Sequence, residues 1–253
     1  MAYDTDREVM GRRFGFGAAT QAEAAEIDVG LRSYMLKIYN YMASGLLLSG
    51  IVAVLVANTG LQDVFFQTTA TGRLGYTGLG YVAVFAPIGI ILYMNFAAAR
   101  MSNTKLQGLY WALVGTMGIG LAVLLKIYTG ASVARVFFIT SAAFGALSLY
   151  GYTTKRSLSG MGTFMMMGLF GLIIAMVVNL FVASSMMQFV ISAIGVLVFS
   201  GLIAFDTQRL KNEYFEVQGT SMVERAAIFG AVSLYLNFVN LFQFLLSFLG
   251  NRE

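Results

Sequence analysis

The chain has 253 residues, of which 58% are hydrophobic and only 11% are charged. Soluble domains carry about 25% charged residues, so we predict a polytopic membrane protein and exclude the disordered, collagenous and coiled-coil classes. The sequence has no cysteine or histidine, which excludes thiolate and imidazole chemistry, and its net charge of +4 comes with no basic cluster interleaved with aromatic residues, so no nucleic-acid partner is expected.

The first 33 residues form the one long polar segment, in which basic and acidic side chains are mixed. No apolar region follows a basic start, so the segment is not a cleavable signal peptide. We expect residues 1–33 to be a disordered cytoplasmic tail. This tail either is simply solvated or binds a partner protein.

From residue 34 to residue 250 the sequence predicts an all-α transmembrane domain. A hydrocarbon core of ~30 Å needs runs of about 20 apolar residues. Seven such runs follow one another, approximately at 34–57, 79–98, 106–125, 133–152, 162–183, 187–206 and 226–249. The fifth and sixth are separated only by Ser184, Ser185 and Met186, so a count of six or eight is the alternative.

Lysine and arginine predict the orientation. With the N-terminus inside, the inside segments carry 12 of the 16 basic residues and the outside segments carry 4. Because basic residues are enriched in cytoplasmic loops, this distribution favours a cytoplasmic N-terminus and an outward C-terminus. We expect a multi-pass membrane protein, with the lipid bilayer as its main partner.

Asp206 is the one acidic residue that falls within an apolar run or at its end. A carboxylate at the centre of a membrane helix costs about 2.5 to 3.5 kcal/mol, so it should face protein or water. Two interpretations remain open. Asp206 either ends the sixth run at the cytoplasmic interface, or takes part in the function.

The seventh run has a polar seam, which consists of Ser233, Asn237, Asn240, Gln243 and Ser247. On a helix these residues fall within roughly 120° of one another, so the seam should face the inside of a bundle. It is either hydrogen-bonding glue between helices or the lining of a hydrophilic path.

Motifs of the common enzyme classes are missing from the sequence. It has neither a phosphate-binding GxxxxGK[ST] loop nor a GxGxxG turn, and no pair of acidic residues within the apolar runs. We therefore expect a protein that is not an enzyme and that needs no cofactor or bound metal.

Three segments resemble a known family. They resemble the Bax inhibitor-1 family, in its bacterial YccA-like branch. The fourth-to-fifth helix of that family is similar to LYGYTTKR at 149–156 together with LSGMG at 158–162. Its sixth helix is similar to FDTQ at 205–208, and its last helix to SLYLNFVNLF at 233–242. The resemblance covers about residues 32–250.

The resemblance implies a seven-helix fold with the last helix at the centre. It also implies one of two functions: a pH-sensitive calcium leak, with calcium ions or protons as partners, or regulation of a membrane-bound ATP-dependent protease without transport. The channel-like leak is our first hypothesis, with Asp206, Asn237, Asn240 and Ser233 in its pathway or gate. Arg100 is the expected counter-charge of Asp206.

This sequence departs from the family pattern at two positions. The calcium-leak mechanism of the family uses two aspartates that share a proton; Asp206 matches the first, but the second falls on Asn237, and an acidic residue of the fourth-to-fifth loop falls on Ser157. An amide cannot reproduce the repulsion between two carboxylates, so we expect weak pH dependence. Counting residues along the predicted runs separates Asp206 and Asn237 by ~10 Å in depth, so their contact is implied by the resemblance alone.

Overall fold

The computed structural model describes the backbone of residues 5–69 and 74–251, with side chains from Ile27 onward. Its elements, in chain order, are α1 (Thr5–Asn58), α2 (Gln62–Phe65), β1 (Phe66–Thr68), β2 (Leu74–Tyr76), α3 (Gly78–Ala97), the 3-10 turn η1 (Ala98–Arg100), α4 (Asn103–Leu121), α5 (Leu124–Ile127), α6 (Gly130–Thr153), α7 (Ser159–Val182), α8 (Ser185–Val217) and α9 (Val223–Leu249).

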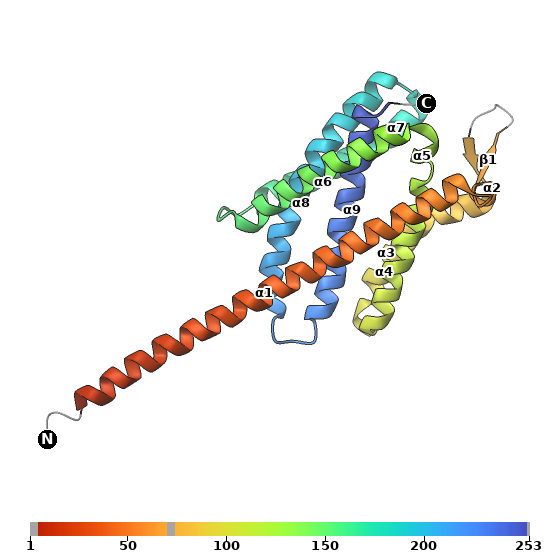
Figure 1. Ribbon diagram of the computed structural model, residues 1–253. Helices are drawn as coiled ribbons and strands as arrows, with labels where there is room; N and C mark the ends of the chain where they lie inside the picture. Colours follow the sequence, from red (N-terminus) through yellow and green to blue (C-terminus); the bar gives the residue numbers. More distant parts are fainter. Residues whose placement is uncertain (1–4, 70–73, 252–253) are drawn as a thin grey trace.

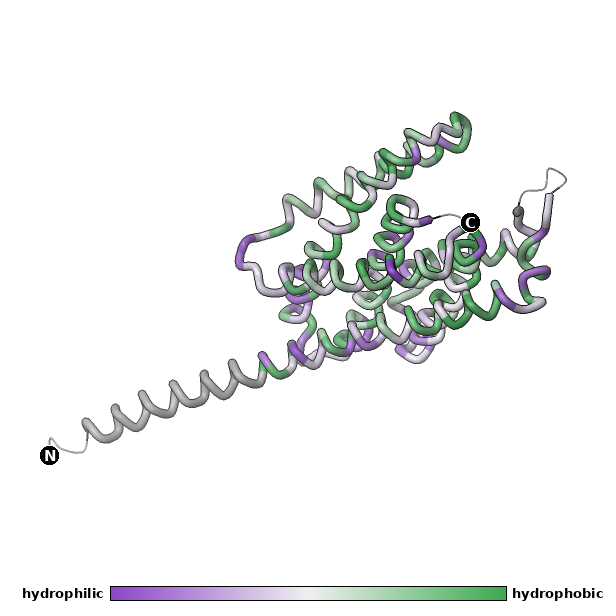
Figure 2. Tube along the Cα trace, turned by 45° about the horizontal axis from the view of Figure 1, so that its top comes forward, coloured by the Kyte–Doolittle hydropathy of each residue, from purple (hydrophilic) through white to green (hydrophobic). Residues whose placement is uncertain are grey.

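Seven of these helices are long and apolar enough to cross a membrane, which confirms the predicted number of spans. The start of α1 and the end of α9 lie at opposite ends of the bundle, as an odd number of spans requires (Figure 1). Figure 2 shows hydrophobic residues along the helices of the bundle and hydrophilic residues gathered at turns such as the one between α6 and α7. An antiparallel pair, β1 with β2, joins α2 to α3 and was not predicted.

The structure differs from the expected disordered segment over 1–33. From Thr5 onward these residues belong to α1, which continues without interruption to Asn58 and extends beyond the bundle at its N-terminal end (Figure 1). The segment contains no proline and is rich in alanine between residues 18 and 25, which suits a helix. Residues 1–4 lie outside the described residues.

Hydroxyl side chains determine where several spans begin. Thr77, Ser102, Thr129 and Ser184 precede α3, α4, α6 and α8, and each accepts a hydrogen bond from a backbone N–H in the first turn. Such caps satisfy donors that have no partner within the helix. The predicted tight turn between the fifth and sixth runs is confirmed: α7 ends at Val182, Ala183 has a left-handed backbone with φ 52°, and α8 starts two residues later.

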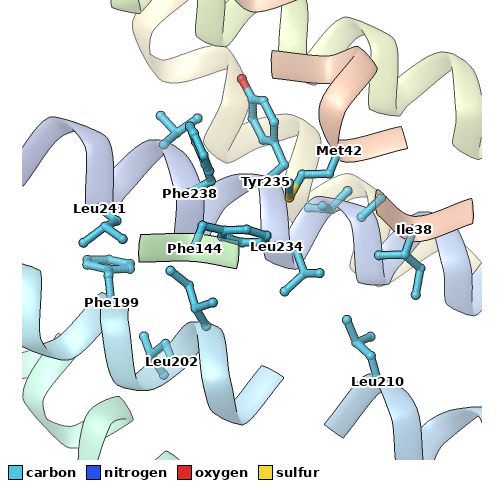
Figure 3. Close-up of a cluster of buried hydrophobic side chains, with 14 of the residues drawn as sticks. Ile38, Met42, Phe144, Phe199, Leu202, Leu210, Leu234, Tyr235, Phe238 and Leu241 are labelled. Carbon is cyan, nitrogen blue, oxygen red and sulfur yellow. The ribbon is translucent and has the colours of Figure 1, made fainter. Parts of the chain in front are cut away.

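The last helix is the most enclosed of the seven spans. It packs against α8, α1, α6 and α4, whereas α7 packs mainly against α8. Figure 3 shows the resulting core, in which Leu234, Tyr235, Phe238 and Leu241 of α9 meet side chains from α1, α6 and α8. The predicted central position of the last helix is therefore confirmed.

Polar side chains tie α9 to its neighbours within this apolar core. The hydroxyls of Tyr235 and Ser49 are 2.6 Å apart, and the Ser49 hydroxyl is also 2.7 Å from the backbone oxygen of Val114. These contacts join α9, α1 and α4. Nearer the turn between α8 and α9, the Lys37 ammonium pairs with the Glu224 carboxylate.

The helices α6 and α8 approach closely at Gly151, where an added Cβ would collide with the backbone oxygen of Ala204. We expect Gly151→Ala to lower the free energy of unfolding by about 1 to 3 kcal/mol, because overpacking forces the backbones apart. Thermal unfolding of the purified protein measures the change. Gly145→Ala, on the same helix, is the matched control, because a Cβ there meets nothing within 4 Å. Equal melting temperatures for the two variants would contradict the argument.

Candidate functional site

One face of α9 is less buried than the rest of the helix. The partly buried positions from Ser233 onward are Ser233, Leu236, Asn240, Gln243 and Ser247, which recur every three or four residues. This spacing is that of a single helical face. Four of the five seam residues lie on this face, and the fifth, Asn237, is buried. Ser233, Asn237 and Ser247 bond to side chains of α8, which confirms that the seam faces the inside of the bundle.

A cavity of about 1360 Å³, here called the α9 cavity, lies along this face. One wall comes from α8 and α9 and carries the polar groups of the cavity, here called the polar wall: all five seam residues, Gln188, Asp206 and Arg209. Apolar side chains of the same two helices lie between them: Phe199, Leu202, Phe205, Leu236 and Phe244. The opposite wall is mainly apolar and comes from α3, α5 and α7, with Val84, Phe85, Ile88, Leu124, Ile127, Tyr128, Met166, Leu169, Leu172, Ile173 and Met176.

The carboxylate of Asp206 forms the charged end of the polar wall. Its Oδ2 accepts hydrogen bonds from the Ser233 hydroxyl at 2.6 Å and from the Asn237 amide at 2.7 Å. Its Oδ1 accepts from Arg209, at 3.0 Å from Nε and 2.9 Å from Nη2. These four residues are the Asp206 cluster. Because a buried carboxylate is costly unless paired and hydrogen-bonded, the cluster accounts for an acidic side chain that is only 12% exposed.

The contact between Asp206 and Asn237 corrects the depth estimate made from the sequence. That estimate assumed a sixth span ending at Asp206, but α8 continues from Asp206 to Val217, eleven residues further. Residues equally far from the middle of a turn lie at similar depths in two antiparallel helices. Taking residue 220 as the middle, position 206 is level with position 234, between Ser233 and Asn237. Helix α8 therefore does not end at Asp206, and its carboxylate lies level with the part of α9 that carries Ser233 and Asn237.

The counter-charge of Asp206 is Arg209, so the expectation for Arg100 is wrong. Arg100 is exposed at the end of η1. Arg209 lies one helical turn after Asp206 on the same helix, and residues three apart on a helix are neighbours. This spacing was visible in the sequence and was the signal that could have identified Arg209. Its guanidinium also reaches the Ser233 hydroxyl, with Nη2 at 3.3 Å, and so joins α8 to α9.

Uncharged side chains occupy the other end of the α9 cavity. The Ser192 hydroxyl donates to the Ser247 hydroxyl at 2.9 Å, and the Gln188 amide is 3.4 Å from the same oxygen. The Asn179 amide of α7 reaches the Gln188 side-chain oxygen at 3.3 Å. Here, too, the seam works as glue between helices while it lines the cavity.

Between the two ends, Asn240 is less constrained than Asn237. The Asn240 amide donates to the backbone oxygen of Leu236 at 2.8 Å, a bond within its own helix. Asn240 also lines the α9 cavity, so the rest of its amide group can interact with water or an ion there. Among the residues that the structure describes, the cavity lining contains a single carboxylate, that of Asp206. A cation on this wall would therefore meet one carboxylate, already paired with the Arg209 guanidinium, and several neutral oxygens.

Comparison with known proteins places the chain among bacterial membrane proteins. The family described as "Inhibitor of apoptosis-promoting Bax1" matches residues 31–253. An uncharacterized protein of Rickettsia prowazekii is 47% identical over 235 residues, which cover 92% of this chain and 96% of the relative. The inner membrane protein YbhL of Escherichia coli K12 is 40% identical over 230 residues, which cover 88% and 94% respectively.

These matches confirm the family but not the finer branch. The relative YbhL does not identify the branch, so assignment to the YccA-like branch stays a prediction. The match includes nearly all of the first span, the six other spans, the polar seam and the Asp206 cluster. The chain is an integral membrane protein of the Bax inhibitor-1 family.

Proposed function

We propose that the protein is a channel-like ion leak and that the α9 cavity is part of its pathway. One observation supports this proposal most directly: the five seam residues line a single cavity that ends at the Asp206 cluster. Polar groups at membrane depth are expensive and usually mark ion or substrate routes. A seam that only tied helices together would not need to face a cavity of this size.

Calcium is the proposed ion because the polar wall presents oxygen ligands. Calcium prefers carboxylate, amide and water oxygens. Asp206 supplies a carboxylate, while Asn237 and Asn240 supply amide oxygens if their side chains turn. Conduction needs binding that is weak enough for release, and one carboxylate paired with Arg209 meets that condition.

The Asp206 cluster is the proposed gate. Its hydrogen bonds connect α8 to α9 across the charged end of the cavity, and both oxygens of the carboxylate are engaged. An ion would have to replace at least one of these partners in order to pass. Opening therefore requires Ser233, Asn237 or Arg209 to release Asp206.

Calcium flux from liposomes tests the proposal. Purified protein reconstituted with an entrapped calcium indicator should admit calcium faster than protein-free liposomes of the same lipid composition. Absence of flux from correctly folded protein would contradict the leak and favour the second hypothesis, a non-transporting regulator of a membrane-bound protease. Co-purification with such a protease from the native membrane would then be the next measurement.

We also propose an inner-membrane location with a cytoplasmic N-terminus. The relative YbhL is described as an inner membrane protein, and the distribution of basic residues is 12 inside against 4 outside. Reporter fusions at residue 20 and after residue 253 should therefore be active on the cytoplasmic and the outer side, respectively. Activity of both fusions on one side would contradict seven spans in the membrane.

A further inference from the structure

The α9 cavity has a second, apolar wall that an ion pathway does not need. On α3 this wall includes Ile88, which is 56% exposed, and on α7 it includes Ile173, which is 44% exposed. Both residues therefore lie at the rim of the cavity. Helix α3 packs mainly against α4, and α7 mainly against α8. The cavity thus opens sideways between α3 and α7.

This opening lies at the depth of the hydrocarbon core. Ile88 is ten residues after the first residue of α3, and Ile173 is fourteen residues after the first residue of α7. At ~1.5 Å per residue these distances are about 15 and 21 Å along the helices. What meets the opening in a membrane is therefore the chains of the surrounding lipid, not their headgroups.

The lining of the opening suits a flexible hydrocarbon chain. Met166 and Met176 lie on α7 along the apolar wall, and methionine side chains adapt to irregular apolar shapes. Contact between water and such an apolar wall is unfavourable, so a hydrocarbon chain fits the wall better than water does. The cavity, at about 1360 Å³, is larger than the roughly 300 to 1,000 Å³ usual for sites of small ligands. It can hold a chain along the apolar wall and still leave space beside the seam.

The charges in the cavity argue against a headgroup as the occupant. Asp206 and Arg209, the charged residues of its lining, are paired with each other. Their charges sum to zero, so they do not offer an anion site for a phosphate. We therefore expect water and ions, and not a lipid headgroup, beside the polar wall.

We propose that an acyl chain of a bilayer phospholipid enters the α9 cavity between α3 and α7 and lies along its apolar wall. This site does not depend on ion conduction. It would exist equally in a protein that transports nothing.

Fluorescence quenching tests the site, because the sequence has no cysteine and a single introduced thiol can be labelled. The reporter is a small fluorophore on Leu236→Cys, which is on the cavity-facing side of α9. The labelled protein is placed in vesicles of phosphatidylethanolamine and phosphatidylglycerol, part of the phospholipid being brominated in the middle of its chains. Brominated lipid should quench this label strongly, and aqueous iodide should quench it weakly.

Controls separate the cavity from the protein surface. Phe170→Cys, on the exposed face of α7, should be quenched by brominated lipid to a comparable degree. Ser157→Cys, at the exposed turn between α6 and α7, should respond only to iodide. If Leu236→Cys does not fold, Leu169→Cys serves as the reporter, because it lines the cavity at nearly the same depth as Phe170.

A second variant tests the route of entry. Ile88→Trp narrows the opening and should reduce lipid quenching at the cavity reporter, while quenching at Phe170→Cys stays unchanged. Quenching of the cavity reporter by iodide alone, or by neither agent, would overturn the proposal. Undiminished lipid quenching in the Ile88→Trp background would overturn entry between α3 and α7.

Discussion

Replacing Asn237 by leucine should reduce calcium flux in liposomes about tenfold or more. The Asn237 amide donates to Asp206 Oδ2 at 2.7 Å, and its side chain lies between Ser233 and Asn240 on the polar wall of the α9 cavity. Leucine has a similar size but carries no oxygen, so a passing calcium ion loses the amide ligand that Asn237 would offer. The lost hydrogen bond to Asp206 would by itself favour opening, but the apolar side chain blocks the polar route. Leucine also places an apolar group at the proposed gate, and apolar groups at a gate favour the loss of water from a pore.

The matched control for this prediction is Asn95→Leu. Asn95 is exposed on α3 and donates only within its own helix, to the backbone oxygen of Ile91 at 2.8 Å. The same substitution there should leave flux unchanged. Size-exclusion profiles and melting temperatures of both variants separate transport from folding. Normal flux in a folded Asn237→Leu variant would remove the seam from the mechanism, while loss of folded protein would mean that Asn237 serves mainly as glue.

Asn237→Asp should make flux depend steeply on pH in a protein whose wild-type flux varies weakly between about pH 6 and 8. The substitution would bring two carboxylates within hydrogen-bonding distance, because Asn237 Nδ2 is already 2.7 Å from Asp206 Oδ2. Two carboxylates this close repel each other and tend to retain one shared proton. The shared proton would hold α8 and α9 together, and its loss at higher pH would push them apart. Flux should therefore rise with pH.

Two further variants control this experiment. Asn240→Asp adds the same charge one turn away, at a residue bonded to its own helix. It should not produce the steep dependence. Combining Asn237→Asp with Asp206→Asn leaves one carboxylate and should abolish the dependence again. If the wild type is strongly pH-gated and stays so in Asp206→Asn, the sensor lies elsewhere and the Asp206 cluster is not the gate.

The sequence predicted the spans well because hydropathy and helical period are local properties. All seven runs became helices, and the seam residues of α9 share one face, since a helix places residues three and four apart together. The span ends were less accurate. The largest error was α8, which continues to Val217 because a helix does not have to end where its apolar residues end.

The partners of Asp206 show the limit of such local reasoning. Arg209 could have been found from its spacing of three residues, but the more distant Arg100 was expected instead. The contacts of Asp206 with Ser233 and Asn237 depend on where α8 ends and α9 begins, because the length of the two helices up to their turn decides which residues lie level with each other. Counting along apolar runs therefore placed Asp206 and Asn237 too far apart.

By itself the sequence determined that this chain crosses a membrane seven times and that its last helix carries a polar face, because both follow from side-chain chemistry along single helices. Only the tertiary structure decided that this face lines a cavity and that the cavity ends at a carboxylate held by three side chains. These features arise from which helices pack together and at what depth. In a membrane nearly every helix is apolar, so hydropathy does not distinguish one packing partner from another.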